Sequence, residues 1–320
     1  MAKWEKIGLI FSPQKDGTST WSETFAQAPC AVVHSNFVRV YFSTRPKPTN
    51  GQYVSNSGYV DLDRNNLTKI IGRSKHPILP LGKLGTFDEF GIYPVSVIKN
   101  QDGHYVCYYA GWTRCASVPF NVAIGMAISK DDGRTFEKIG EGPILPYTPD
   151  EPFILSGPKI RRFQDQWVLW YIAGRKWILD EGKPEPIYSI RMATSDNGLD
   201  WTRYNRNLIP DILENEAQAS PDVIYHGGKY HMFFSFRHGL NYRGKKFGYR
   251  IGYAHSSDMI NWTRDDSQAG IDISKSGWDD EMISYPNVFE LDGEIYLFYL
   301  GNDVGKEGFG LARLVPGTLT

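Results

Sequence analysis

The sequence has few cysteines, almost no net charge and no long apolar run, and each absence narrows the class of protein. The three cysteines, Cys30, Cys107 and Cys115, are an odd count, and two of them lie in strand patterns where free buried thiols are common. A net charge of −1 leaves no basic face for nucleic acid and no polybasic run for a membrane. No apolar segment is long enough for a signal peptide or a membrane span. We therefore expect a reduced, cytoplasmic protein that binds neither nucleic acid nor membranes.

Common metal and nucleotide motifs are also missing from the sequence. There is no HExxH, no CxxC pair and no glycine-rich phosphate loop, and the seven histidines are scattered. We therefore expect neither a metal nor an organic cofactor. Of the histidines, only His238 follows an arginine, Arg237, at a position of functional interest.

Five similar stretches are what the sequence does contain. Each begins with a proline, continues as an apolar strand and a polar turn, and ends in a strand rich in Tyr, Phe and Trp. The prolines are at positions 29, 94, 158, 221 and 286, which gives steps of 65, 64, 63 and 65 residues. A repeat built only from short strands is typical of a propeller blade. The pattern predicts an all-β fold, a five-bladed β-propeller with four-stranded antiparallel blades.

A second repeated element follows each proline by about thirty residues. Its copies include 124–136, 190–201 and 251–262, each a strand that ends in a polar turn and an aromatic residue. Asp131 or Asp196 can accept hydrogen bonds from the turn amides, and Gly133 or Gly198 supplies a positive φ. The turn resembles the Asp box of sialidase propellers. We interpret it as a structural clip far from the central funnel.

The two ends of the chain fit together in this scheme. Residues 4–11 match the fourth strand of a blade, while the C-terminal stretch stops after a third strand. We expect the N-terminal strand to complete the last blade and close the ring, which leaves no open sheet edge. Residues 1–320 are then a single propeller domain.

Charged residues gather where the blade geometry predicts one shared face. Residues just before each proline and just after each second strand should emerge together at the funnel. Glu89, Glu216 and Glu281 each stand five residues before a proline and are our candidate catalytic carboxylates. Candidate substrate-binding residues on the same face are Asp88, Arg45, Arg114, Arg175, Arg237, His238, Asp280 and Tyr285. Residues 242–246 and 305–308 form rim loops that are either lids or solvated connections, and we favour the second interpretation.

Carboxylates and arginines that converge in this way suit sugar chemistry. Cleavage of a glycosidic bond uses one carboxylic acid to protonate the leaving oxygen and one carboxylate as base or nucleophile. Arginines bind carboxylates or phosphates in a bidentate manner. The alternative is that these charges pair with one another and tie neighbouring blades together.

The repeated proline–strand–turn–aromatic core and the IGxAxSxDGxxW-like third strand resemble the five-bladed propeller glycosidases of families 43, 32, 68 and 130. The resemblance covers nearly the whole chain and implies the fold and a glycoside-cleaving activity. Families 43 and 32 place an Asp near the first-blade proline, where this chain has Ala28 and its nearest acid is Glu23. Family 130 includes phosphorylases that bind phosphate through cationic funnel residues.

The sequence therefore predicts a glycosidase-like enzyme that acts on an anionic or decorated saccharide. Glu216 is the candidate general acid, by analogy of blade position, and Glu89 or Glu281 the partner carboxylate. Two alternatives stay open: a phosphorylase that depends on inorganic phosphate, and a glycan-binding propeller without catalysis. Phosphate dependence would identify the first, and binding without product the second.

Overall fold

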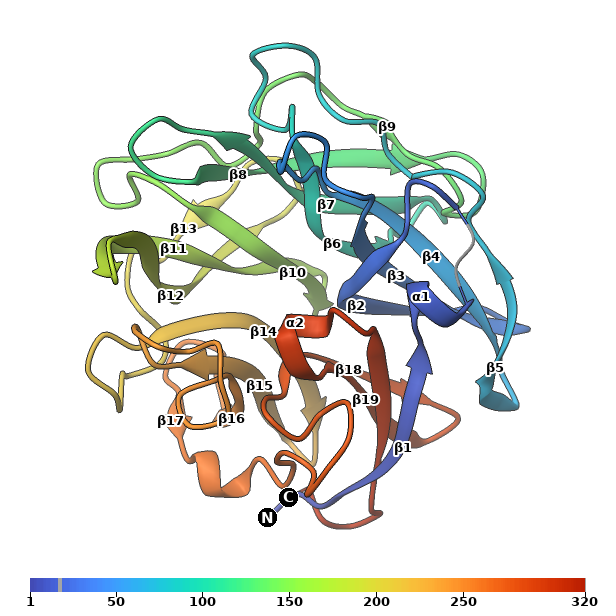
Figure 1. The fold of residues 1–320 in the computed structure, drawn as a ribbon. Helices are drawn as coiled ribbons and strands as arrows, with labels where there is room; N and C mark the ends of the chain where they lie inside the picture. Colours follow the sequence, from blue (N-terminus) through green and yellow to red (C-terminus); the bar gives the residue numbers. More distant parts are fainter. Residues whose placement is uncertain (17–18, 320) are drawn as a thin grey trace.

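The computed structural model describes residues 1–16 and 19–319 and forms a five-bladed ring (Figure 1). Each blade is a four-stranded antiparallel sheet, and the innermost strands β2, β6, β10, β14 and β18 surround the centre. The prediction of a five-bladed β-propeller is confirmed.

The strand bounds place each repeat in one blade. From the axis outward, blade 1 consists of β2 (Thr24–Val33), β3 (Phe37–Arg45), β4 (Asn56–Asp63) and β5 (Asn66–Arg73), and blade 2 of β6 (Gly91–Lys99), β7 (Tyr105–Arg114), β8 (Phe120–Ser129) and β9 (Glu137–Lys138). Blade 3 consists of β10 (Leu155–Phe163), β11 (Gln166–Asp180), β12 (Lys183–Ser195) and β13 (Thr202–Arg203), and blade 4 of β14 (Ala217–His226), β15 (Lys229–Arg237), β16 (Arg250–Ser256) and β17 (Thr263–Arg264). Blade 5 consists of β18 (Ser284–Leu291), β19 (Glu294–Leu300), β20 (Phe309–Leu314) and β1 (Trp4–Phe11). Two helical turns, α1 (Pro13–Asp16) and α2 (Asn302–Gly305), and the 3₁₀ turn η1 (Asp266–Gln268) lie in connections.

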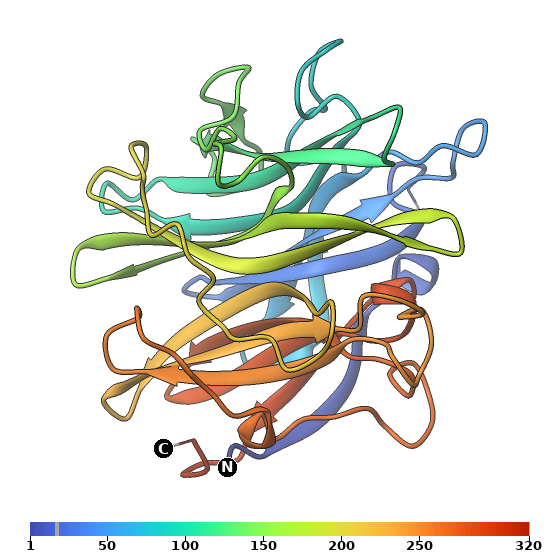
Figure 2. The ribbon, with the colours of Figure 1, turned by 90° about the vertical axis from the view of Figure 1, so that its left-hand side faces the viewer.

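The N-terminal strand closes the ring. β1 pairs antiparallel with β20, from Trp4 opposite Leu314 to Phe11 opposite Phe309. The N- and C-termini consequently lie close together at the same blade in both views (Figures 1 and 2). Because β1 satisfies the outer backbone groups of β20, blade 5 has the same four strands as the others.

The hydrophobic core is divided among the five blade interfaces. A separate buried cluster fills each interface, because both faces of every blade carry apolar side chains that must be covered by a neighbour. Trp170 and Met232, for example, meet between blades 3 and 4, and Phe42 and Phe298 between blades 5 and 1. Contacts between the apolar faces of neighbouring blades thus stabilise the ring, and polar groups are accommodated at the two ends of the central axis.

The repeated polar turns connect neighbouring blades. The hydroxyl of Tyr41 in blade 1 donates to the carbonyl of Gly133 at 2.7 Å, and that of Tyr108 in blade 2 donates to Gly198 at 2.7 Å. Asp131 accepts the turn amides in blade 2 as expected. In blade 3 the acceptor is Asn197 and not Asp196, because Asn197 holds the position two residues after the serine.

A β-bulge marks the repeated proline in every innermost strand. The pairing register shifts at each of the five sites, for example between Ser156 and Lys159 and between Ser284 and Asn287. The residue before the proline has a positive φ in four blades, including 51° at Ala28 and 53° at Tyr285. Bulges redirect side chains locally. At these bulges Pro29, Pro94, Pro158 and Pro286 line a narrow space between the innermost strands.

Candidate functional site

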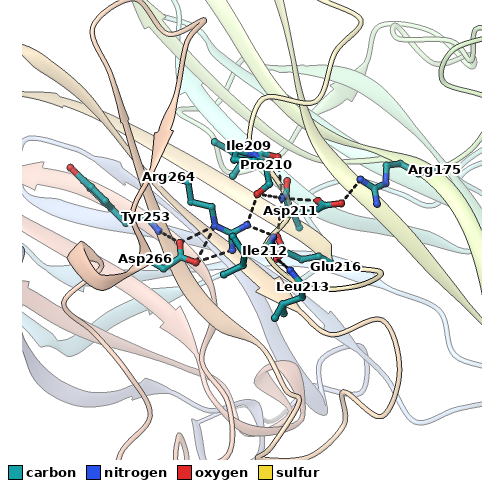
Figure 3. Close-up of polar contacts among 11 residues, drawn as sticks. Arg175, Ile209, Pro210, Asp211, Ile212, Leu213, Glu216, Tyr253, Arg264 and Asp266 are labelled. Carbon is teal, nitrogen blue, oxygen red and sulfur yellow. Dashed lines mark hydrogen bonds and ion pairs between the residues drawn. The ribbon is translucent and has the colours of Figure 1, made fainter.

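Glu216, the predicted general acid, lies in a buried ion pair. Its carboxylate contacts the Arg264 guanidinium at 2.6 Å, and Arg264 also contacts Asp266 at 2.8 Å (Figure 3). The amide of Gln218 and the backbone amides of Ile212 and Leu213 donate to the same carboxylate. Both Glu216 oxygens are therefore already satisfied by the protein.

The same arrangement recurs in four of the five blades, and we call it the blade clasp. In each case a carboxylate ahead of the innermost strand pairs with a cation on the outermost strand. The four clasps are Asp88–Lys138, Glu151–Arg203, Glu216–Arg264 and Asp279–Lys6. In three of them a tyrosine of the second strand, Tyr109, Tyr171 or Tyr299, donates to the carboxylate.

The clasp connects the two edges of a blade through its buried middle. In blade 1 the corresponding acid, Glu23, pairs with exposed Lys47, its one ionic partner among residues 1–16 and 19–319. From the sequence, the alternative to a catalytic role is that the acids pair with cations and connect neighbouring blades. Asp88 and Glu216 do form such pairs, but each pair joins two strands of the same blade.

The other predicted acids, Glu89, Asp280 and Glu281, do not line the central cavity. Glu89 is half-buried and accepts a hydrogen bond from the backbone of Gly85 at 2.9 Å. Glu281 is exposed. Asp280 accepts a hydrogen bond from the side chain of Asn302 at 2.8 Å. The structure does not bring the three aligned glutamates into one cluster, and their catalytic role stays a prediction.

Among the predicted cations, three have protein partners at the rim. Arg114 donates to the carbonyl of Tyr53 and lies over the Phe90 ring. Arg175 pairs with Asp211 at 2.7 Å, and the ring of His238 packs against Phe247. None of the three lines the central cavity.

The central funnel is a cavity of about 480 Å³. It lies between the starts of the innermost strands and the ends of the second strands, the face that the repeat pattern predicted. Among the predicted residues, Arg45, Arg237 and Tyr285 line it, and Tyr93, Tyr188 and Tyr249 add further phenol groups. Its volume and its mix of aromatic and charged groups are typical of a small-molecule site.

Arg237 is a buried cation without a carboxylate partner among the described residues. It is 1% exposed, and its guanidinium donates to Tyr249 and to the backbone carbonyls of Pro186, His238 and Gly239. Burial works against its charge, yet the surrounding tyrosine oxygens hold the guanidinium pKa above the ordinary arginine value. The funnel thus contains a fixed positive charge.

Arg45 contributes a second unpaired guanidinium to the cavity. It lies 4.7 Å from the centre of the Phe25 ring and 5.4 Å from that of Tyr53. Its Nε is buried without a hydrogen-bond partner in the described chain. Burial raises the pKa of the nearby Tyr93 hydroxyl to about 12, against the lowering effect of the Arg45 charge.

Glu185 and Tyr242 form a polar contact inside the funnel that the sequence did not predict. The Tyr242 hydroxyl donates to Glu185 at 3.0 Å, and Arg243 contacts the other Glu185 oxygen at 2.5 Å. Glu185 is 6% exposed, and Arg237 lies 3.7 Å over the Tyr242 ring. A carboxylate, a phenol and two guanidinium groups are therefore in direct contact.

Two elements from different blades hold this group in place. Glu185 lies on the β11–β12 hairpin of blade 3, whose pairing extends to Asp180 opposite Lys183. Tyr242 and Arg243 lie in the β15–β16 connection of blade 4, where the Asn241 amide donates to Asp180 at 2.9 Å. Residues 242–243 of this connection therefore line the cavity, and only its exposed positions match the solvated loop that we expected.

Asp303 is the other carboxylate that lines the funnel. It lies on α2, is exposed, and has Lys306 at 3.7 Å. The backbone around it is irregular, with φ of 51° at Asp303 and 54° at Val304. The Gln27 side chain donates to the Val304 carbonyl at 2.6 Å and so anchors this turn to blade 1.

Neither a metal cluster nor a membrane helix is found in residues 1–16 and 19–319. No group of three or more His, Cys, Asp or Glu side chains there could hold a metal ion. No helix in the same ranges is long and apolar enough to cross a membrane.

Two curated relatives match almost the whole chain, and both are proteins without an assigned function. The chain is 34% identical over 313 residues to the uncharacterised Mycobacterium tuberculosis protein Rv1502, a match that covers 97% of this chain and 99% of that protein. The protein MT1551 of another M. tuberculosis strain matches equally. A shorter segment of 96 residues is 31% identical to a β-1,2-mannobiose phosphorylase of Thermoanaerobacter sp., covering 28% of this chain and 31% of the phosphorylase. No protein-family model matches the chain.

Solved structures share the fold at low sequence identity. A structure of BT0996 in a complex with RGII has a TM-score of 0.76 at 18% identity, and the match covers 99% of this protein and 93% of that one. A member of the GH130 family, described as mannoside phosphorylases together with glycoside hydrolases that target β-1,2-mannosidic linkages in Candida mannan, has a TM-score of 0.70 at 16% identity, covering 98% and 93%. The fold resemblance to the five-bladed propeller glycosidases is confirmed.

Proposed function

The chain belongs to the family of the M. tuberculosis proteins Rv1502 and MT1551. Because it shares its fold with glycoside-active propellers, we propose that it cleaves a glycosidic bond in the central funnel. The substrate is an anionic saccharide. The proposal rests on the groups that line the cavity and not on the fold alone, because one fold hosts many activities.

The observation that carries the proposal is the pair of guanidinium groups, Arg45 and Arg237, that face the funnel without a carboxylate partner in the described chain. A buried charge is costly unless it is paired. Arg237 is fully buried, and the oxygens that accept its hydrogen bonds are neutral. An anion that enters the funnel would therefore balance the positive charge of its guanidinium. Arg237 already donates to Tyr249 and to three backbone carbonyls and so contributes mainly its charge, whereas Arg45 can pair with a planar carboxylate through two parallel hydrogen bonds. A carboxylate or phosphate group on the sugar therefore suits the site better than a neutral sugar.

The catalytic groups that the cavity offers are Glu185 and Asp303. Glycosidic cleavage needs two carboxyl groups that flank the bond, and these two line the same cavity from the non-adjacent blades 3 and 5. Glu185 accepts hydrogen bonds from Tyr242 and Arg243, which suits an ionised carboxylate that acts as a base. Asp303 is exposed to the funnel and is the candidate acid that protonates the leaving oxygen.

The competing candidates for catalysis are the three carboxylates predicted from the sequence, Glu216, Glu89 and Glu281. Glu216 has its oxygens occupied within a blade clasp, and neither Glu89 nor Glu281 lines the cavity. Substitution of each by glutamine separates the two sets.

Phosphorolysis is a second candidate function. It is favoured by the local similarity to a β-1,2-mannobiose phosphorylase and by the same unpaired arginines, which would bind inorganic phosphate as well as a carboxylate. In that case phosphate would attack the anomeric carbon in place of water.

The test is a product screen of the purified protein on neutral and anionic oligosaccharides, with and without inorganic phosphate. We expect free sugar from an anionic substrate without phosphate. Product that appears only with phosphate would identify a phosphorylase. Saturable binding without product on any substrate would identify a glycan-binding propeller and overturn the proposal.

A further inference from the structure

The contact between Tyr242 and Glu185 resembles an activated nucleophile more than a structural hydrogen bond. The phenol donates to the carboxylate at 3.0 Å, and both side chains line the cavity. Two cations flank the phenol, since Arg237 lies 3.7 Å over its ring and Arg243 lies 4.5 Å from the ring centre. Burial raises the pKa of the Tyr242 hydroxyl above its ordinary value, while the charges of Arg237 and Arg243 act in the opposite direction and favour the phenolate that develops when the proton moves to Glu185. An adjacent base and nearby cations are the features that turn a weak nucleophile into a reactive one.

A phenol nucleophile has an advantage for one class of glycoside. Where the anomeric carbon itself carries a carboxylate, as in 2-keto sugar acids, an enzyme carboxylate that attacked this carbon would meet the like charge of the substrate at contact distance. A neutral phenol that passes its proton to a carboxylate behind it avoids that repulsion. Tyrosine nucleophiles in sialidases are a known exception to the two-carboxylate rule for glycosidases.

The arginines of the funnel fit the carboxylate of such a substrate. Arg237 and Arg45 have no acidic partner in the described chain, and Arg243, whose side chain is 62% exposed, shares its charge with Glu185. Arg237 contacts the ring of Tyr242. The buried positive charge of Arg237 therefore lies next to the nucleophile, which suits a carboxylate attached to the reacting carbon and not one placed across the sugar ring.

We propose that Tyr242 is the catalytic nucleophile of this protein and that its substrate is the glycoside of a 2-keto sugar acid, an inference that rests on the proposed glycosidase function. In the first step the Tyr242 oxygen bonds to the anomeric carbon and its proton moves to Glu185. The bond from that carbon to the leaving oxygen breaks, and the leaving oxygen takes a proton from Asp303. In the second step water gives a proton to Asp303 and its oxygen bonds to the anomeric carbon. The Tyr242–sugar bond then breaks, and the phenol oxygen regains its proton from Glu185.

The test uses three fluorogenic 4-methylumbelliferyl glycosides with the full-length protein. They carry a neutral mannose, a glucuronic acid with its carboxylate away from the anomeric carbon, and N-acetylneuraminic acid as the 2-keto sugar acid. We expect cleavage of the third alone. Tyr242→Phe keeps the ring between the two arginines and should lower kcat by about 10² or more, as loss of a catalytic proton-transfer group does. Tyr225→Phe, at an exposed site on β14, is the matched control with unchanged kcat.

A trapped intermediate identifies the nucleophile directly. A 2,3-difluoro derivative of the sugar acid should form a lasting covalent adduct. Trypsin would release residues 238–243 as one peptide in which Tyr242 is the single tyrosine, while Glu185 lies in the peptide 177–191. We expect the sugar mass on the first peptide and its loss in Tyr242→Phe.

The outcomes separate this inference from the function on which it rests. Cleavage of the mannoside or the glucuronide alone, an adduct on peptide 177–191, or full activity of Tyr242→Phe would overturn the role of Tyr242 and leave a glycosidase in place. No cleavage of any glycoside in this set or in the oligosaccharide screen would overturn the proposed function itself.

Discussion

The Arg264 guanidinium lies 2.6 Å from the Glu216 carboxylate, and the two side chains are 3% and 0% exposed. This ion pair joins the chain ahead of β14 to the outer strand β17 and so spans blade 4. Its position explains why an acid found by its distance from the proline need not be a catalytic acid. In four of the five blades a carboxylate at this place pairs with a cation on the outermost strand.

Loss of the Glu216 carboxylate should destabilise the protein. Glu216→Ala removes one of the two carboxylates paired with buried Arg264 and leaves Asp266 and the Pro210 carbonyl as its partners. The cost should therefore approach but not exceed that of a fully broken buried pair, about 3–5 kcal/mol. Urea unfolding followed by tryptophan fluorescence measures the change. Glu281→Ala, at an exposed position outside the funnel, is the control and should change the unfolding free energy by about 0.5 kcal/mol or less. Unchanged stability of Glu216→Ala together with lost turnover would favour the catalytic role predicted from the sequence.

Arg45→Gln should weaken binding of an anionic substrate with little effect on folding. Arg45 makes no ion pair in the described chain, so its charge is free for the ligand. Loss of a charged hydrogen bond costs about 1.5–3 kcal/mol, which corresponds to a rise in KM of about 10- to 150-fold. Arg114→Gln is the matched control, because Arg114 ends the second strand of blade 2 as Arg45 ends that of blade 1 but lies outside the cavity lining. Equal effects of the two substitutions would contradict a specific role for Arg45.

The stability of the protein should fall in acid through His34. Burial, with the nearby charge of Arg39, lowers the pKa of His34 from 6.5 to about 4, and its ring packs against Phe37 and Tyr105. Between these values the unfolded chain binds a proton that the folded chain does not, so stability is lost as the pH falls from about 6.5 towards 4.

The urea midpoint measured between pH 7 and pH 4 tests this effect. His34→Phe keeps the ring stack and should show a shallower decline than the wild type. His104→Gln, an exposed histidine, should follow the wild type. A wild-type slope in His34→Phe would show that other groups cause the acid sensitivity.

Deletion of residues 1–11 should prevent stable closure of the ring. It removes β1, exposes the edge of β20 and leaves Asp279 without Lys6. We expect loss of the cooperative unfolding transition and aggregation through the free edge, measured by circular dichroism and size-exclusion chromatography. Deletion of Met1 alone, which is exposed and outside the strand, is the control. A monomeric, cooperatively folded deletion variant would contradict the importance of this closure.

The architecture could be predicted from the sequence because the repeated residues are the ones that form the strands and the interfaces of each blade. Prolines mark the bulges of the innermost strands, and aromatic second strands fill the interfaces. The expectation that Arg45 and Arg237 face the funnel has the same basis, since each ends a second strand there, and both line the cavity. The equal spacing of Glu89, Glu216 and Glu281 before their prolines did not predict equivalent positions in the structure, because only Glu216 belongs to a blade clasp. The clasp carboxylates Asp88, Glu151, Glu216 and Asp279 stand six, seven, five and seven residues before their prolines, because the connecting loops differ in length.

Glu185 and Tyr242 lie outside the repeat, which is why the pattern did not reveal them. Glu185 is in an extension of the β11–β12 hairpin, between Pro184 and Pro186, which interrupt the strand pattern. Tyr242 is in a polar, glycine-containing connection whose composition is typical of a solvated loop. Both reach the funnel only because the hairpin of blade 3 and the loop of blade 4 contact each other through Asp180 and Asn241. A contact between two insertions has no local signal in the sequence.

The most direct test of the central claim compares Glu185→Gln with Glu216→Gln in turnover of the anionic glycoside that the screen identifies. Arg243, the ionic partner of Glu185, is 62% exposed, so Glu185→Gln should unfold at nearly the wild-type urea concentration. We predict that its kcat falls by about 10² or more. Glu216→Gln should instead lose stability and keep most of its turnover per folded molecule. Full turnover in Glu185→Gln, with loss of turnover in a stably folded Glu216→Gln, would contradict the placement of the chemistry in this funnel.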